Sequence, residues 1–198
     1  MQREKENSEE VIEDSFDHFQ PKKTRFADEV EFKVSNIHKK GAKNLAKRLL
    51  KLSKIGVIPV DLLKIQEFLN DADLYILDIL PNPDFTSRIS AQIVKTKLLN
   101  EEIYTLGYNP AKPYCHQRFS IAHELGHLIF NTTHILGSGK SDIEIDANIF
   151  AADLLMPTDI LKTDLKTIKN VKELAIRYRV SEEAMFRKIN DNNLLKYI

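Results

Sequence analysis

The five residues from His123 to His127 could hold a metal ion and activate a water molecule beside it. They read His-Glu-Leu-Gly-His, and positions i and i+4 of an α-helix lie on the same face. His123 and His127 can therefore present two imidazole nitrogens to one ion, which zinc binds at about 2.0–2.1 Å. Glu124 lies on the flank of that face, where its carboxylate can reach a water on the ion without being a ligand. This HExxH pattern is typical of zinc-dependent peptide-bond hydrolysis.

The residues around the motif predict that its helix is buried. Apolar side chains recur there at helical spacing, at Ile121, Ala122, Leu125, Leu128 and Ile129. Histidines beside such a stripe need partners, and a metal ion is one of the partners that can satisfy them. Gly126 costs about 1 kcal/mol relative to alanine in a helix interior. Its presence suggests that another backbone passes close by.

A third ligand is expected from the helix that follows. Apolar residues between Ser141 and Pro157 fit one helix, which the proline ends; they are Ile143, Ala147, Phe150, Ala151, Leu154 and Leu155. The preceding LGSGKS reads as a turn that returns this helix alongside the first. Glu144 and Asp146 are then the two candidates for the third ligand.

Spacing alone leaves the choice between these two acids open. Ser141 and Glu144 have the spacing of a capping box, in which the glutamate bonds back to the helix start. Asp142 and Asp146 could equally be first-turn acids that the helix dipole favours.

Two stretches together resemble a known family. RFSIAHELGHLIF followed by EIDANIFAADLLMP is similar to the ImmA/IrrE family of bacterial and phage metallopeptidases. A weaker similarity extends upstream through GVIPVDLLKIQEFL and downstream through VKELAIRYRVSEEAMFRKI. It covers roughly residues 36–190 in all, and the first thirty-five residues lie outside the resemblance.

This resemblance implies a zincin-like core with zinc held by two histidines and one glutamate. By position, His123, His127 and Glu144 would be the ligands and Glu124 the general base. Asn148, one turn after Glu144, would hydrogen-bond a ligand. Asp146 becomes the less favoured candidate, although its substitution for Glu144 as ligand stays open. The family's substrates are helix-turn-helix repressors, whose cleavage releases stress-response or mobile-element genes. A repressor of this kind is therefore the expected partner.

The rest of the chain predicts an α+β fold with a short mixed or antiparallel sheet. Helices are expected at 37–55 and from Leu62 onward, and strands at 74–80, 87–95 and 101–108. We expect a charged N-terminal segment at 1–35, a zinc metallopeptidase domain at 36–165 and a C-terminal helical extension at 166–198. If strand 101–108 is an edge of the sheet, a substrate could add to it as an extended strand.

Two helical segments could suggest nucleic-acid binding. The 37–55 helix is rich in lysine, but it carries no interleaved aromatic residues for stacking on bases. The segment 171–189 resembles a helix-turn-helix, but Glu182 and Glu183 would face phosphates at the start of its second helix. A solvated helix face and a packing or substrate-recognition element are the expected interpretations, so direct DNA binding is not expected.

Composition sets further limits. The 198 residues are 42% apolar and carry no net formal charge, so no overall field attracts nucleic acid or membranes. No stretch approaches the roughly 20 apolar residues of a membrane span. The charged start MQREKENSEE does not read as a secretory signal. Cys115 is the single cysteine, which excludes an internal disulfide, and it is assigned no role. We expect a cytoplasmic protein.

The sequence thus predicts a zinc-dependent endopeptidase that cuts a protein substrate. Its oxyanion-stabilising group is left open among Tyr108, Tyr114, His116 and His134. The alternative is a transcriptional regulator or partner-binding protein with a structural zinc.

Overall fold

The computed structural model describes residues 39–72, 75–99, 101–130 and 141–198. The predicted N-terminal segment 1–35, most of the LGSGKS turn and the candidate His134 lie outside these residues. The described elements follow the chain in the order α2 (Lys39–Leu52), α3 (Leu62–Asp71), β1 (Ile76–Pro81), β2 (Ala91–Leu98), β3 (Glu101–Tyr108), α4 (Tyr114–Ile129), α5 (Ser141–Leu155), α6 (Thr158–Asp164), α7 (Val171–Tyr178), α8 (Glu182–Asp191) and η1 (Leu195–Tyr197).

The three described strands form a mixed sheet in the order β1-β3-β2. β1 runs parallel to β3, with Ile79 opposite Leu106, and β2 runs antiparallel to β3, with Ile93 opposite Leu106. The α+β fold predicted from the sequence is therefore confirmed. The idea that 101–108 is an edge strand is wrong, because β3 lies in the centre of the sheet. β2 is an outer strand instead.

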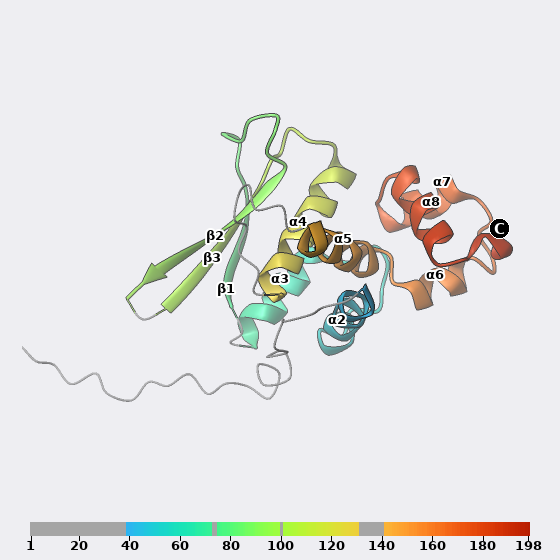
Figure 1. The fold of residues 1–198 in the computed structure, drawn as a ribbon, viewed down its shortest axis with the longest axis horizontal. Coiled ribbons are helices and arrows are strands. Elements are labelled where there is room, and N and C mark those ends of the chain that lie inside the picture. Colours follow the sequence, from blue (N-terminus) through green and yellow to red (C-terminus); the bar gives the residue numbers. More distant parts are fainter. Residues whose placement is uncertain (1–38, 73–74, 100, 131–140) are drawn as a thin grey trace, which may run out of the picture.

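Helices cover one side of this sheet (Figure 1). α3 packs on β1 and α4 packs on β2 and β3, while α5 lies against α4 on the side away from the sheet. Leu77 and Leu106 point into this interface and are fully buried. α2 packs on α5, and its buried side chains include Ala42, Ala46 and Leu49.

The C-terminal helices are fixed to the same body. Asn170 and Ser181 cap α7 and α8 through their side chains, and a short turn joins the two helices. Lys188 of α8 forms a 2.6 Å ion pair with Asp153 of α5, and both side chains are almost completely buried. Burial lowers the pKa of the Lys188 ammonium, and the Asp153 carboxylate opposes that change. The predicted division between 36–165 and 166–198 stays a prediction.

None of the helices in the described part of the chain has both the length and the apolar character that a bilayer crossing needs.

The contact between α4 and α5 depends on Gly126. A Cβ atom at this position would lie 3.1 Å from Cδ1 of Phe150 and 3.3 Å from the backbone Cα of Ala147. Phe150 in turn packs edge to face on Phe130, with 5.5 Å between the ring centroids. The neighbouring backbone that the sequence predicted at Gly126 is therefore α5, held close by Ala147.

We predict that Gly126→Ala destabilises the protein although alanine is the better helix former. Alanine gains about 1 kcal/mol of helix propensity, but overpacking against the α5 backbone costs about 1–3 kcal/mol. Urea unfolding should therefore show a net loss of about 1 kcal/mol. Gly56→Ala is the matched control, because nothing lies within 4 Å of a Cβ there. An equal change in both variants would contradict this account of the interface.

Candidate metal centre

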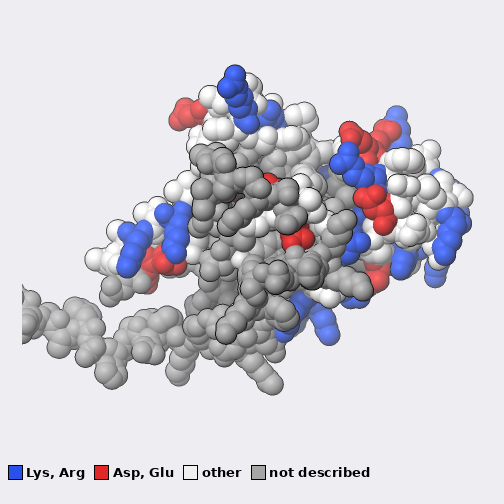
Figure 2. All heavy atoms as spheres, in the orientation of Figure 1, with Lys and Arg blue, Asp and Glu red and all other residues white. Residues whose placement is uncertain are grey.

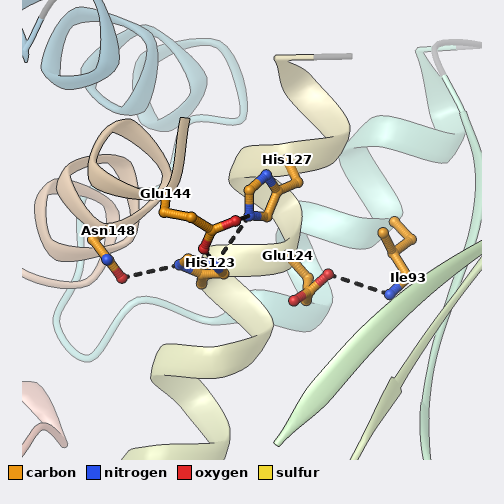
Figure 3. Close-up of polar contacts among 6 residues, drawn as sticks. All are labelled: Ile93, His123, Glu124, His127, Glu144 and Asn148. Carbon is orange, nitrogen blue, oxygen red and sulfur yellow. Dashed lines mark hydrogen bonds and ion pairs between the residues drawn. The ribbon is translucent and has the colours of Figure 1, made fainter. Parts of the chain in front are cut away.

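α4 positions both histidines of the motif on one face. His123 and His127 lie one turn apart, with 4.7 Å between their ring centroids and 3.0 Å between their Nε2 atoms. Both rings point away from the sheet and toward α5 (Figure 3). His127 is buried and the side chain of His123 is 15% exposed. The fold therefore brings two imidazole nitrogens to one point that remains open to solvent on the His123 side.

Glu144 reaches the same point from α5. Its Oε2 lies 3.3 Å from Nε2 of His123, and its Oε1 lies 3.4 Å from Nε2 of His127. The Glu144 side chain is 47% exposed, so a ligand could approach beside it. The carboxylate therefore faces both histidines across the helix pair.

The three side chains fit a metal ion. Ligands about 2.0–2.1 Å from a tetrahedral ion lie about 3.3 Å from one another, and the observed separations are 3.0, 3.3 and 3.4 Å. His123, His127 and Glu144 form the group with metal-ligating atoms within 4.8 Å of one another among the described residues.

Asn148 orients the first histidine. Its Oδ1 lies 3.0 Å from Nδ1 of His123. An amide oxygen accepts a hydrogen bond, so this contact favours the tautomer of the neutral ring with its proton on Nδ1. Nε2 of His123 then presents a lone pair to the point that it shares with His127 and Glu144. Asn148 thus lies where the sequence resemblance placed it, one turn after Glu144.

Glu124 lies outside the converging group, on the side toward the sheet. Its side chain is buried, and its Oε2 accepts a 3.3 Å hydrogen bond from the backbone N–H of Ile93 in β2 (Figure 3). No pattern in the sequence pointed to Ile93, because this contact depends on the order and register of the strands. One edge of the carboxylate is thereby fixed relative to both the histidines and β2.

Asp146, the other candidate for the third ligand, lies away from the metal centre. Asp146 is buried and does not belong to the group around His123. Cys115, which was assigned no role, is a free thiol in the first turn of α4, partly buried.

The candidates for an oxyanion-stabilising group are spread along α4 and β3. Tyr114, in the first turn of α4, contacts Arg179 through its hydroxyl at 3.4 Å. His116 lies two turns before His123, and its Nε2 is 2.8 Å from the Ser90 hydroxyl. Tyr108 ends β3, opposite Ala91. Among the described candidates, none has a hydrogen bond to the three converging side chains, so the oxyanion role stays a prediction.

A tyrosine that the sequence analysis missed braces the end of the motif helix. The Tyr75 hydroxyl donates to the carbonyl of Leu128 at 3.4 Å, and its ring packs edge to face on Tyr104. Burial, together with the nearby Tyr104, raises the pKa of Tyr75 to about 12. The phenol therefore stays protonated near neutral pH and can keep donating to the helix.

Comparison with solved structures supports the fold. One solved structure, described as a Mycobacterium tuberculosis transcriptional regulator, aligns with a TM-score of 0.53 and 16% sequence identity. The alignment covers 80% of this chain but 48% of that one, so the chain spans about half the length of its structural relative. At this identity the likeness shows the fold alone. No curated protein matches the chain.

A family model gives the stronger result. The model of the peptidase family M78, described as the IrrE N-terminal-like domain, matches residues 83–190. That range contains the β2 edge, all three converging side chains, Glu124 and the C-terminal helices. It supports a metal-dependent, peptidase-like function. Because the match spans more than half of the 198 residues, the chain belongs to the IrrE N-terminal-like domain family.

Proposed function

We propose that the protein is a zinc-dependent endopeptidase that hydrolyses a peptide bond in a protein substrate. The observation that carries this proposal is the convergence of His123, His127 and Glu144 on one point, with Glu124 held beside it. His123 and His127 would hold the zinc through Nε2, and Glu144 through its carboxylate. Two imidazoles and one carboxylate are a donor set of catalytic zinc sites, which keep a fourth position for water or substrate.

Zinc supplies a Lewis acid that polarises the scissile carbonyl and lowers the pKa of a water to about 7. Glu124 performs the proton transfer in the proposed reaction. Its carboxylate accepts a proton from the attacking water and then donates it to the nitrogen of the leaving amine. The hydrogen bond from Ile93 N–H to Oε2 holds the carboxylate in position for both steps.

The outer strand β2 would bind the substrate. The backbone carbonyl of Ser90 accepts a hydrogen bond from the backbone N–H of Asn109, the residue after β3, so Ser90 faces β3. The backbone N–H of Ile93 instead points away from β3, to Glu124. In an antiparallel pair, alternate residues direct their backbone groups to the same side. Ala91 and Lys95 therefore direct theirs away from β3, to the side of β2 where no other described strand pairs and where an extended substrate could add as a further strand. Such binding would place a peptide carbonyl beside Glu124 with little demand on sequence.

We further propose that the substrate is a helix-turn-helix repressor and that the protein acts on it in the cytoplasm. The resemblance to the ImmA/IrrE family supports this assignment. The exposed Glu182 and Glu183 at the start of α8 disfavour phosphate contact, so the C-terminal helices are assigned to packing or substrate recognition.

The zinc assignment predicts about one zinc ion per chain. His123→Ala, His127→Ala and Glu144→Ala should each lose most of the bound metal, because each removes one of three protein ligands. Asp146→Asn should keep it. Metal content measured by mass spectrometry after dialysis checks this, with circular dichroism to confirm folding. Loss of zinc in Asp146→Asn but not in Glu144→Ala would show that the third ligand has been misassigned.

Glu124→Gln separates catalysis from metal binding. Zinc content and thermal stability should stay near those of the parent, while cleavage falls by at least about 100-fold, since glutamine cannot accept the proton. The assay is co-expression with the helix-turn-helix repressor encoded nearest to this protein, followed by detection of a shortened product. Cleavage at the parent rate would remove Glu124 from the reaction, and uncut repressor with the zinc-loaded parent would favour a regulator with a structural zinc.

Asn148 should control zinc affinity through His123. Asn148→Ala removes the acceptor at Nδ1, and we expect zinc affinity to fall by about 10–100-fold. Asn148→Asp keeps an acceptor at Nδ1, so its zinc affinity should be closer to that of the parent than the affinity of Asn148→Ala is. Competition with a chromogenic chelator gives the three affinities. Equal affinities in the parent and Asn148→Ala would show that this contact does not orient the histidine.

A further inference from the structure

A second concave surface lies between α2 and α6, apart from the metal centre. This lysine groove has a volume of about 510 Å³, within the size range of ligand sites. Its walls come from α2 and the residues after it, the end of α5, the start of α6 and the residue after α8. Lysines Lys43, Lys47, Lys51 and Lys54 line its α2 side, and Figure 2 shows basic atoms over that helix.

The lysines form a row. Lys43, Lys47 and Lys51 recur once per helical turn, which spaces their backbone positions by about 6 Å. Lys54 extends the row beyond the helix, because its left-handed conformation, with φ of 55°, turns the chain at that point. In an extended peptide, alternate side chains are separated by a similar distance of about 6.6 Å. A row with this spacing suits a linear ligand with repeated negative charges better than a single small anion.

The charges in the groove are only partly balanced. Lys47 pairs with Asp159 at 2.6 Å, and Asp153 is occupied by the buried Lys188. Lys43 donates to the neutral amide oxygen of Asn192 at 2.9 Å. The side chains of Lys51 and Lys54 are exposed and form no hydrogen bond or ion pair with any residue that the structure describes. The lysine groove therefore keeps an excess of positive charge on one wall.

The remaining lining favours a peptide over a nucleic acid. Leu50, Ile55, Pro157 and Ile160 provide apolar contacts between the lysines and α6. The lining contains no aromatic side chain and no arginine, so bases would find no stacking surface and phosphates no bidentate partner. Apolar contacts interleaved with lysines suit a peptide in which acidic and apolar residues alternate.

The groove is connected to the metal centre through one helix. Asp153 at its edge and Glu144 at the metal centre both lie on α5, nine positions apart, which corresponds to about 14 Å along the helix. Nine positions correspond to two and a half helical turns, so the two side chains lie on opposite faces of α5. A substrate held at the metal centre must therefore pass around α5 to reach the groove, which takes more residues than the axial distance alone.

We propose that the lysine groove is a docking site for an acidic, extended segment of the protein substrate, remote from the bond to be cut. This inference rests on the proposed peptidase function for the identity of the partner, but the binding itself does not require catalysis. Lys51 and Lys54 make the main charge contacts, and the apolar wall takes the side chains between the acids. Docking there raises the local concentration of the cleavable segment at β2.

The test measures binding directly. The probe is a fluorescein-labelled eight-residue peptide of alternating glutamate and valine, and the protein is the full-length Glu124→Gln chain loaded with zinc. Fluorescence anisotropy should show binding that weakens as salt concentration rises. The double variant Lys51→Glu, Lys54→Glu should weaken it at least about tenfold, and the double glutamine variant should weaken it by a smaller factor. Unchanged zinc content and circular dichroism show that the variants are folded.

The matched control is the double variant Lys64→Glu, Lys172→Glu, which changes the net charge equally at two other exposed lysines. Equal weakening by both glutamate variants, or no binding to the parent, would overturn the proposal. Tighter binding of an oligothymidylate of the same charge would assign the groove to nucleic acid. Tighter peptide binding after neutralisation of Glu9, Glu10, Glu13 and Asp14 would assign it to this chain's own acidic residues. Each of these outcomes is independent of whether the parent cleaves a repressor.

Discussion

The metal centre depends on how closely two helices can approach each other. His123 and His127 lie on α4, whereas Glu144 and Asn148 lie on α5, so neither helix can form the site alone. The separation of the two helices therefore decides whether the carboxylate can share one ion with the histidines, because ligand bonds to zinc tolerate little variation in length. Gly126 permits the approach by presenting no side chain to Ala147. The energetic disadvantage of glycine inside a helix is therefore offset by the tertiary contact that it allows.

Around this pair, the fold supports two of the reactive side chains and the end of α4. Asn148 orients His123, the Ile93 N–H orients Glu124, and Tyr75 braces the end of α4. The supports come from α5, from β2 and from the residue before β1, so the geometry of the site depends on how these parts pack together. The buried ion pair between Asp153 and Lys188 extends the same rigidity to the C-terminal helices.

Much of the fold and the site could be predicted from local patterns. The HExxH motif and its apolar stripe identified α4, and the apolar periodicity with Pro157 identified α5, because each signal lies within one helix. Strand 101–108 was also predicted with its observed bounds. The choice between Glu144 and Asp146 could not be made from spacing, since both lie in the first turns of α5 and only tertiary packing decides which one faces α4. The family resemblance favoured Glu144, and the structure brings that residue to the histidines.

Sheet order was the part that local patterns could not supply. The sequence offered 101–108 as the edge, yet β1 pairs with β3 on the far side from β2, so the outer position falls to β2. Strand order depends on long-range pairing, which leaves no periodic signal in a single sequence. The Ile93 contact was missed for the same reason.

The hydrogen bond between Ile93 and Glu124 links the metal centre to a distant turn. It forms because Ile93 stands opposite Leu106, and a slip of one residue would point the N–H at that position toward β3. The alignment of the two strands is set where they join, between Leu98 and Glu101, and Leu99 adopts there a φ of 54°. That tip lies about 17 Å along the strand from Ile93. The hairpin tip therefore sets the strand register that positions the carboxylate of Glu124.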